Sequence, residues 1–226
     1  MPELILETEK MLLYQQQLGE WNNLNHLIIC KSSNQACIID PFDGKFWLDF
    51  CQLMEVEITE IWLTHTHWDH IKGVDALYHN SDIQPILSCH ILEQQRGYES
   101  TRADWWTHDE LSSVATMFGD IEFTVHCTPG HSPGHVTIIG DGAIITGDCL
   151  FLHSCGRTDL FGGDQEKQRQ SVIYLKEVFD TVSLDSLILP GHQYEQDDGS
   201  IPTTVELETF LQAVSYTHLR AHETCV

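Results

Sequence analysis

The spacing of apolar and polar residues along the chain predicts short strands with helices at intervals. In the first forty residues, apolar runs bounded by Gly, Asn and Ser turn signals predict strands at 11–18, 26–31 and 36–40. Between Asp43 and Met54 the apolar residues recur at helical spacing, which predicts a helix with one face on a core. Later segments predict strands at 60–64, 84–88, 121–127, 136–140, 143–147 and 186–190, and helices at about 70–79, 165–179 and 203–211.

This order of elements predicts an α/β fold. Two β-rich halves with helices at intervals are typical of two packed sheets flanked by helices. No repeat, low-complexity stretch or linker divides residues 1–212, so we expect a single domain. The least patterned stretch, Glu93 to Gly119, is interpreted either as an active-site lid or as a surface loop anchored by aromatic residues.

The last fourteen residues form a segment that we set apart from the domain. Residues 213–224 read AVSYTHLRAHET, which resembles the translation of a sequencing adapter running into an open reading frame. We therefore expect the native sequence to stop near Gln212, with its true C-terminus missing, and residues 213–226 to be a non-native tail. His218, His222 and Cys225 are left out of the candidate ligands for that reason.

Composition and charge exclude several classes of function. With 11 Lys plus Arg against 34 Asp plus Glu, the formal net charge is −23, and an acidic surface repels a nucleic-acid backbone. Apolar runs are shorter than the ~20 residues of a membrane helix, and the first ten residues do not resemble a secretory signal. Eight cysteines include no Cys-x-x-Cys pair, which favours reduced thiols. We expect a cytoplasmic protein that binds neither nucleic acid nor membranes, and the oligomeric state stays unknown.

Metal-binding side chains cluster after the predicted strand at 60–64. The segment His65-Thr-His67-Trp-Asp69-His70 places four potential ligands within six residues. Neutral imidazole and carboxylate suit zinc, iron or manganese. Because α/β proteins build their sites at strand ends, three further candidates that follow other predicted strands strengthen the prediction of a metal site. These are His131, Asp148 and His192.

The order of these residues resembles a known ligand series. His-x-His-x-Asp-His, then a His in Pro-Gly-His, an Asp in Thr-Gly-Asp and a final His in Pro-Gly-His is similar to the series of the metallo-β-lactamase-fold hydrolases, over about Leu24 to His192. The resemblance implies an αββα sandwich and two divalent metal ions, zinc in the first place, with iron or manganese as alternatives. It implies one metal on His65, His67 and His131, a second on Asp69, His70 and His192, and Asp148 bridging both.

Within that superfamily, the segment from Gly147 to Asp164 is similar to the glyoxalase II (hydroxyacylglutathione hydrolase) and persulfide dioxygenase branch. Its Gly-Arg-Thr-Asp-Leu-x-Gly-Gly-Asp run is most similar to short bacterial glyoxalase II-like proteins. The resemblance does not extend to the substrate-loop Lys and Tyr that hold glutathione in full-length glyoxalase II, because residues 157–163 have no counterpart of them.

The resemblance implies hydrolysis of a small thioester of the hydroxyacylglutathione type. A water that bridges two metals loses a proton near neutral pH, and the resulting hydroxide attacks the carbonyl carbon. In this scheme Asp148 holds the metal pair and Asp69 orients the second metal.

Alternatives within the same fold remain open. One is a persulfide dioxygenase with a single ferrous iron on His65, His131 and Asp148. Against it, His135 stands where those enzymes tend to have Cys, and Gly191 stands where they tend to have Ala. Another is a lactonase or β-lactamase. A non-enzymatic metal-binding module is disfavoured because no ligand position is missing.

Three further residues are candidates for supporting roles. Asp40 ends a predicted strand and is expected to orient a metal-bound histidine, although an Asp before Pro41 also suits a turn. His135 either lines the pocket or holds its loop. Arg157 is expected to be structural and to pair with Asp159.

Overall fold

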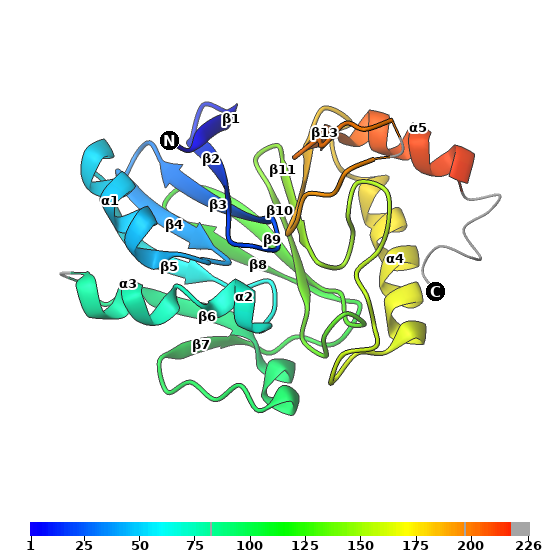
Figure 1. Ribbon diagram of the computed structural model, residues 1–226, viewed down its shortest axis with the longest axis horizontal. Coiled ribbons are helices and arrows are strands. Elements are labelled where there is room, and N and C mark those ends of the chain that lie inside the picture. Colours follow the sequence, from blue (N-terminus) through cyan, green and yellow to red (C-terminus); the bar gives the residue numbers. More distant parts are fainter. Residues whose placement is uncertain (82, 197, 218–226) are drawn as a thin grey trace.

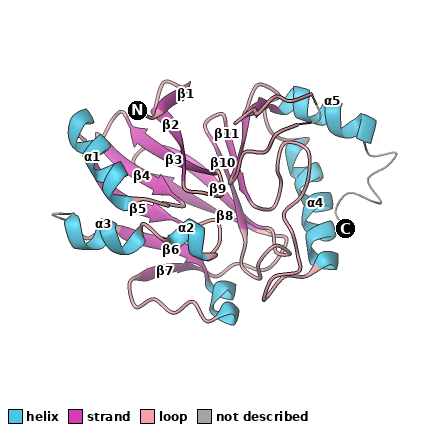
Figure 2. Ribbon diagram, in the orientation of Figure 1, coloured by secondary structure: helices cyan, strands magenta, loops and turns pink. Residues whose placement is uncertain are grey.

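Two mixed β-sheets pack face to face, with helices on their outer faces (Figures 1 and 2). The computed structural model describes residues 1–81, 83–196 and 198–217, with side chains up to residue 213. The predicted fold class is therefore confirmed.

The first sheet runs in chain order, antiparallel from β1 to β4 and parallel from β4 to β7. Its strands are β1 (Glu3–Glu7), β2 (Met11–Leu18), β3 (Asn23–Cys30), β4 (Gln35–Ile39), β5 (Glu57–Trp62), β6 (Ile86–His90) and β7 (Ala103–Trp106). The second sheet has the order β13-β12-β11-β10-β9-β8, with one parallel pair, β11 and β12. Its strands are β8 (Ser113–Phe118), β9 (Ile121–Cys127), β10 (Val136–Gly140), β11 (Ala143–Gly147), β12 (Leu187–Pro190) and β13 (Val205–Glu206).

Helices cover the outer face of each sheet. In Figure 1, α1 and α3 lie on the outer side of the first sheet, and α4 and α5 lie on the opposite side of the molecule. The helices are α1 (Gly44–Met54), α2 (Trp68–Ile71), α3 (Val74–Asn80), α4 (Gln165–Phe179) and α5 (Leu207–Thr217), and residues Ile91–Arg96 form the 3₁₀ helix η1.

Each interface between layers has its own apolar core. Between the sheets, Trp62 of β5 makes edge-on contacts with Phe123 of β9 and Trp106 of β7, at ring-centroid distances of 5.2 and 6.2 Å. A second cluster, which includes Trp47, lies under α1 and α3, and a third, which includes Leu175, lies under α4 and α5. Three apolar interfaces fix four layers, so the loops at the sheet edges are held in place.

The predicted helix at 70–79 is wrong as a single element, because the chain forms α2 and α3 with a break at Gly73. The Gly73 amide donates to the Pro41 carbonyl at 2.7 Å. A Cβ at Gly73 would meet the Gly44 nitrogen at 2.5 Å. The backbone of α1 therefore approaches too closely for one regular helix to continue.

The segment from Glu93 to Gly119 is not one irregular stretch, because it contains the end of η1 and the strands β7 and β8. The expected aromatic anchor is present, since Tyr98 packs edge-on against Trp105 with ring centroids 6.4 Å apart. Each strand lies at an edge of a different sheet, so this segment connects the two sheets. β7 is mostly half-buried and β8 is mostly exposed, so neither strand alternates clearly between buried and exposed positions.

At the C-terminal end, β13 and α5 replace the helix predicted at 203–211. Helix α5 crosses the expected domain boundary at residue 212, and the remainder of the proposed tail, residues 218–226, lies outside the described residues. In the part of the chain that is described, no helix has the length and apolar character needed to cross a bilayer.

His26 of β3 is a buried histidine with a neutral ring. It is 1% exposed, and the Gln15 amide lies 3.0 Å from its Nε2. Burial lowers its pKa to about 3. The unfolded chain titrates this group near its ordinary value of ~6.5, so below that pH the unfolded state binds a proton that the folded state does not. Stability therefore decreases as the pH falls from about 6.5 toward 3.

We predict that His26→Gln reduces this acid sensitivity. Between pH 7 and pH 5 the variant should lose about 2 kcal/mol less unfolding free energy than the wild type, by proton linkage at one site. Urea unfolding at both pH values measures the difference. Equal losses for the two proteins would contradict the argument.

Candidate metal centre

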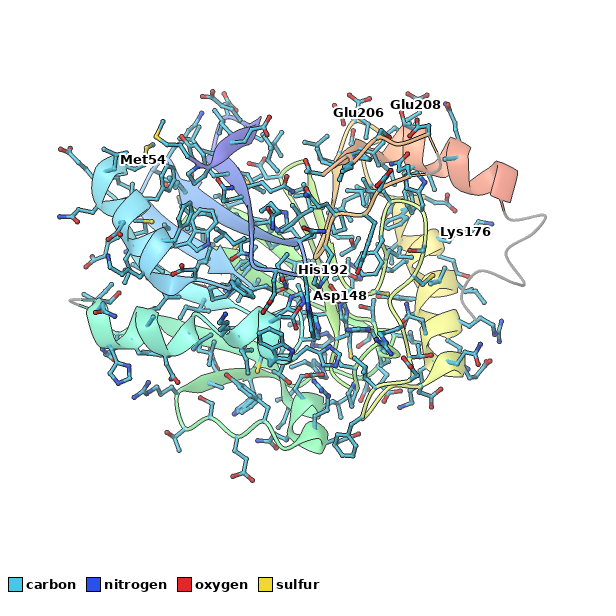
Figure 3. The ribbon with its side chains drawn as sticks, viewed as in Figure 1. Met54, Asp148, Lys176, His192, Glu206 and Glu208 are labelled. Atoms are coloured by element: carbon cyan, nitrogen blue, oxygen red, sulfur yellow. The ribbon has the colours of Figure 1, made fainter. Side chains whose placement is uncertain are left out.

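Four loops, each following a strand, carry the predicted ligands to one place between the sheets. His65 and His67 follow β5, with Asp69 and His70 on α2 just beyond them. The other ligands come from the second sheet, where His131, Asp148 and His192 follow β9, β11 and β12. Figure 3 shows Asp148 and His192 together at the centre of the molecule, between the two helix-covered sides.

The first group, here called the first trio, consists of His65, His67 and His131. All three are buried, and each offers a ligand nitrogen within 4.8 Å of the others. Nδ1 of His67 lies 2.7 Å from Nε2 of His131. Two imidazole nitrogens at that distance can share one proton or face one cation.

The second trio consists of Asp69, His70 and His192, which meet the same distance criterion. Nε2 of His192 lies 3.2 Å from Nε2 of His70 and 3.4 Å from Oδ2 of Asp69. The side chains are again buried, so polar atoms from α2 and from the loop after β12 face each other away from solvent.

Asp148 lies between the two trios. Its Oδ2 is 3.4 Å from Nε2 of His131 in the first trio and 3.3 Å from Nε2 of His192 in the second. Its Oδ1 is 3.5 Å from Nε2 of His70. One carboxylate thus faces both groups, which is the position that a bridging ligand requires.

The polar atoms at this centre fit a cation better than they fit one another. Nε2 of His65 and Oδ1 of Asp148 are buried without a hydrogen-bond partner. A buried acceptor without a partner costs about 1–3 kcal/mol, and a metal ion removes that cost by accepting the lone pair. The donor set of imidazoles and carboxylates is the one that zinc, iron and manganese prefer.

Hydrogen bonds on the outer side of the rings direct lone pairs inward. Nδ1 of His70 donates to Asp40 at 3.0 Å, and Nδ1 of His192 donates to the Trp21 carbonyl at 2.8 Å. Nδ1 of His131 donates to the Arg157 carbonyl at 2.7 Å. A neutral ring that donates from Nδ1 carries its lone pair on Nε2, so these partners fix the tautomer that binds metal.

The pKa values differ between the trios. Burial lowers the pKa of His67 to about 3 and that of His65 well below its ordinary value, which keeps both rings neutral. Burial alone would lower the pKa of His192, but the neighbouring Asp148 carboxylate outweighs burial and raises this pKa to about 9. For Asp148, burial alone would raise the pKa, and the neighbouring His70 and His192 bring it well below the usual range. The second trio therefore attracts positive charge.

The three supporting candidates lie beside the centre, in different roles. The Asp40 carboxylate faces His70 and also accepts hydrogen bonds from the Thr64 amide and hydroxyl, at 2.8 and 2.5 Å. His135 is fully buried, and its Nε2 accepts from the Asp148 amide at 3.0 Å, so it holds the loop and does not line a pocket. The Arg157 guanidinium points to solvent and pairs with Asp159 at 2.6 Å.

Three other residues contribute to the site although no sequence pattern predicted them. The Asn23 side-chain amide donates to Asp69 at 2.8 Å. The Thr64 hydroxyl lies 3.0 Å from Nδ1 of His65. Glu93 accepts hydrogen bonds from the loops that carry His67 and His131. These residues are distant in sequence or of common types, so only the folded chain reveals them.

The comparison with protein families agrees with this geometry. A family model described as the metallo-beta-lactamase superfamily matches residues 26–192. The chain belongs to the metallo-beta-lactamase superfamily. Hydroxyacylglutathione hydrolase from Tolumonas auensis is 31% identical over 174 residues, which cover 75% of this chain and 62% of that protein. The chain thus matches somewhat less than two thirds of the length of this relative.

Solved structures show the same fold. ETHE1 from Myxococcus xanthus superposes with a TM-score of 0.69 at 24% identity, over 87% of this chain and 80% of that one. TTHA1623, solved in a di-iron-bound form, has a TM-score of 0.66 at 25% identity, over 88% of this chain and 97% of that one. The superfamily and the hydrolase relative support a metal-dependent hydrolase.

We predict that Gly191→Ala weakens binding at the second trio. A Cβ at Gly191 would lie 2.3 Å from Oδ1 of Asp148 and 3.1 Å from Cε1 of His70, so the Asp148 carboxylate must move away from His70. Metal content measured by elemental analysis should fall by about one equivalent per chain. Gly97→Ala adds a Cβ where nothing lies within 4 Å but strains the backbone at φ +84°, so it controls for a general loss of stability and should keep the wild-type metal content. Wild-type metal content in Gly191→Ala would contradict the prediction.

Proposed function

We propose that this protein is a binuclear-metal-dependent hydrolase that cleaves a small thioester of the hydroxyacyl type. The observation that carries the proposal is the position of Asp148, whose Oδ2 faces both His131 of the first trio and His192 of the second, while its Oδ1 faces His70. The 31% identity to a hydroxyacylglutathione hydrolase supports the choice of substrate class.

In this proposal the first trio binds one metal, the second trio binds another, and Asp148 is shared. Zinc suits both donor sets, and the di-iron form of TTHA1623 supports iron as the alternative, with manganese also possible by ligand type. When bound, such a pair lowers the pKa of water to supply a nucleophile near neutral pH and polarises the carbonyl group of the substrate.

The residues of the chain hold this centre in a fixed geometry. Asp148 is anchored through its own amide, which donates to His135. Asp69 is held by the Asn23 amide, so its carboxylate faces His192 in one orientation. Both carboxylates are nearly buried, so little bulk water competes for their oxygens.

No protein nucleophile is needed at this centre. The thiol nearest in sequence is Cys149, next to Asp148, and burial raises its pKa to about 12. A thiol with that pKa is a poor nucleophile at neutral pH. The six free cysteines among the described residues are all buried.

A hollow beside His192 is the proposed binding place for part of the substrate. Tyr194 stacks on the His192 ring with centroids 6.1 Å apart, and Phe151 packs edge-on against Tyr194 at 5.0 Å. The lining residues are Phe151, Leu152, His153, Ser154, His192, Tyr194, Glu195, Gln196 and Pro202. This lining contains no Lys or Arg, the side chains that would bind the carboxylates of a thiol such as glutathione most strongly.

The iron persulfide dioxygenase is the alternative within this fold. His135 and Gly191 favour the hydrolase, because one holds the Asp148 amide and the other leaves room for the Asp148 carboxylate beside His70. Both features position the Asp148 carboxylate so that it can reach two metals, whereas a single iron would need only one of the carboxylate oxygens.

We predict that Asp148→Ala abolishes thioester hydrolysis. The variant should lose roughly 10²-fold or more in kcat/KM, since metal catalysis contributes several kcal/mol to transition-state stabilisation. It should also retain less than two equivalents of metal. Asp49→Ala, at an exposed carboxylate on α1 that pairs with Lys45, is the control and should behave as the wild type. Full activity of Asp148→Ala with two bound metals would contradict the bridging role.

We predict little preference for charged thiols. Because no Lys or Arg lines the hollow, kcat/KM for S-lactoylglutathione and for the lactoyl thioester of uncharged N-acetylcysteamine should agree within about tenfold, which corresponds to ~1.4 kcal/mol. Hydrolysis is measured through the amount of free thiol that it releases. A preference for the glutathione ester well above tenfold would contradict the proposal that the thiol part of the substrate binds in this hollow. Oxygen uptake with glutathione persulfide, in place of hydrolysis, would favour the dioxygenase.

A further inference from the structure

Glu93 is a buried carboxylate for which the proposed reaction has no direct use. It lies on η1 and is 0% exposed. Its Oε2 accepts from the Thr66 amide at 2.8 Å and from the Thr66 hydroxyl. Its Oε1 accepts from the Ser132 hydroxyl at 2.6 Å and from the Gly134 amide at 2.8 Å. One side chain thus joins two loops that are more than sixty residues apart in sequence.

Both loops carry ligands of the first trio. Thr66 stands between His65 and His67, and Ser132 directly follows His131. Each Glu93 oxygen holds a backbone amide of one loop, so the carboxylate sets the separation of the two loops. Nδ1 of His67 and Nε2 of His131 meet at 2.7 Å across that gap.

The packing around Glu93 shows that this contact is specific. A Cβ at Gly134 would lie 2.7 Å from the Glu93 backbone nitrogen and 3.0 Å from its Cγ, so the loop approaches η1 as closely as glycine allows. Arg96 places Nη1 3.9 Å from Oε2 and so balances part of the buried charge. Burial of a carboxylate is costly unless it is hydrogen-bonded and paired, and here both conditions are met.

The second trio is supported by other residues. Asp40 holds His70, Asn23 holds Asp69, and the Trp21 carbonyl holds His192. No hydrogen bond or ion pair described for Glu93 reaches this trio. A carboxylate accepts about four hydrogen bonds, and all four of those on Glu93 come from the two loops, which leaves none for a substrate.

We propose that Glu93 is a positioning residue that sets the metal affinity of the first trio by fixing the distance between its two loops. The inference rests on the proposed metal centre and not on the identity of the substrate. A change at Glu93 is therefore expected to weaken metal binding at the first trio only. Glu93 does not contact the metal, so the effect acts through the two loops that Glu93 holds.

Glu93→Gln is the variant that tests this role. Glutamine has the same shape, but one of its two ends is an NH₂ group that must face either the Thr66 or the Gly134 amide, so one loop loses its acceptor. Zinc affinity is measured by chelator competition in an Asp69→Ala background, where the second trio is disabled. We expect the zinc dissociation constant of the first trio to rise about 10–100-fold, the range found for residues that hold metal ligands.

Two controls separate positioning from general stability. Glu60→Gln removes a partly buried carboxylate on β5 that accepts from the Trp62 indole at 2.6 Å and touches neither loop, so zinc affinity should stay within about threefold. Thermal unfolding of the metal-free proteins reports the structural cost of each change. Should Glu93→Gln fail to fold, Ser132→Ala removes one of the four donors and is expected to weaken zinc binding in the same direction by a smaller factor.

The outcomes are distinct. An unchanged first-trio dissociation constant in Glu93→Gln, with or without a lower melting temperature, would overturn the positioning role. Equal weakening at the second trio of the otherwise unchanged chain would also overturn it, because the effect would then be global. A wild-type chain that binds no zinc at all would instead refute the proposed metal centre.

Discussion

The buried Asp148 carboxylate is the constraint on which the centre depends, because it must face imidazoles from three separate loops at once. Its oxygens lie 3.3 to 3.5 Å from nitrogens of His70, His131 and His192. This arrangement requires that the ends of β9, β11 and β12 stay in register with the loop after β5. The apolar core between the sheets, centred on Trp62, keeps that register. The chemistry of the site is therefore coupled to the packing of the layers.

The two trios share one buried support and each has others of its own, which explains the number of buried polar contacts. Asp40 and Thr64 form a chain from β4 to the ring of His70 and to the ring of His65. Glu93 acts on the opposite side, on the loops after β5 and β9. A metal ligand with one fixed tautomer needs a partner on its outer side, which Asp40 and Thr64 provide to the rings, whereas Glu93 holds the loops that carry the rings.

Much of the fold followed from local patterns in the sequence. Periodicity identified helix α4 at its observed bounds, because apolar residues recur at helical spacing on the face that packs against the second sheet. Patterns failed where distant contacts decide the structure. The break between α2 and α3 depends on the close approach of Gly44, and the edge strands β7 and β8 do not alternate clearly between buried and exposed positions. The ligand candidates were visible because they follow strands in a fixed order, whereas Glu93 lies 27 residues from Thr66 in a segment without a motif.

Charge balance is a further reason to regard these contacts as one centre. The buried acidic residues of the described chain are Asp40, Asp69, Glu93 and Asp148, and all four belong to it. The remaining acids, which produce most of the net charge of −23, lie nearer the surface. Arg96 pairs with Glu93, and the other three carboxylates carry more negative charge than one divalent cation would neutralise, with the imidazoles neutral as ligands. Burial of charge on this scale is unfavourable without compensation, so the distribution of acids fits the proposed pair of metals.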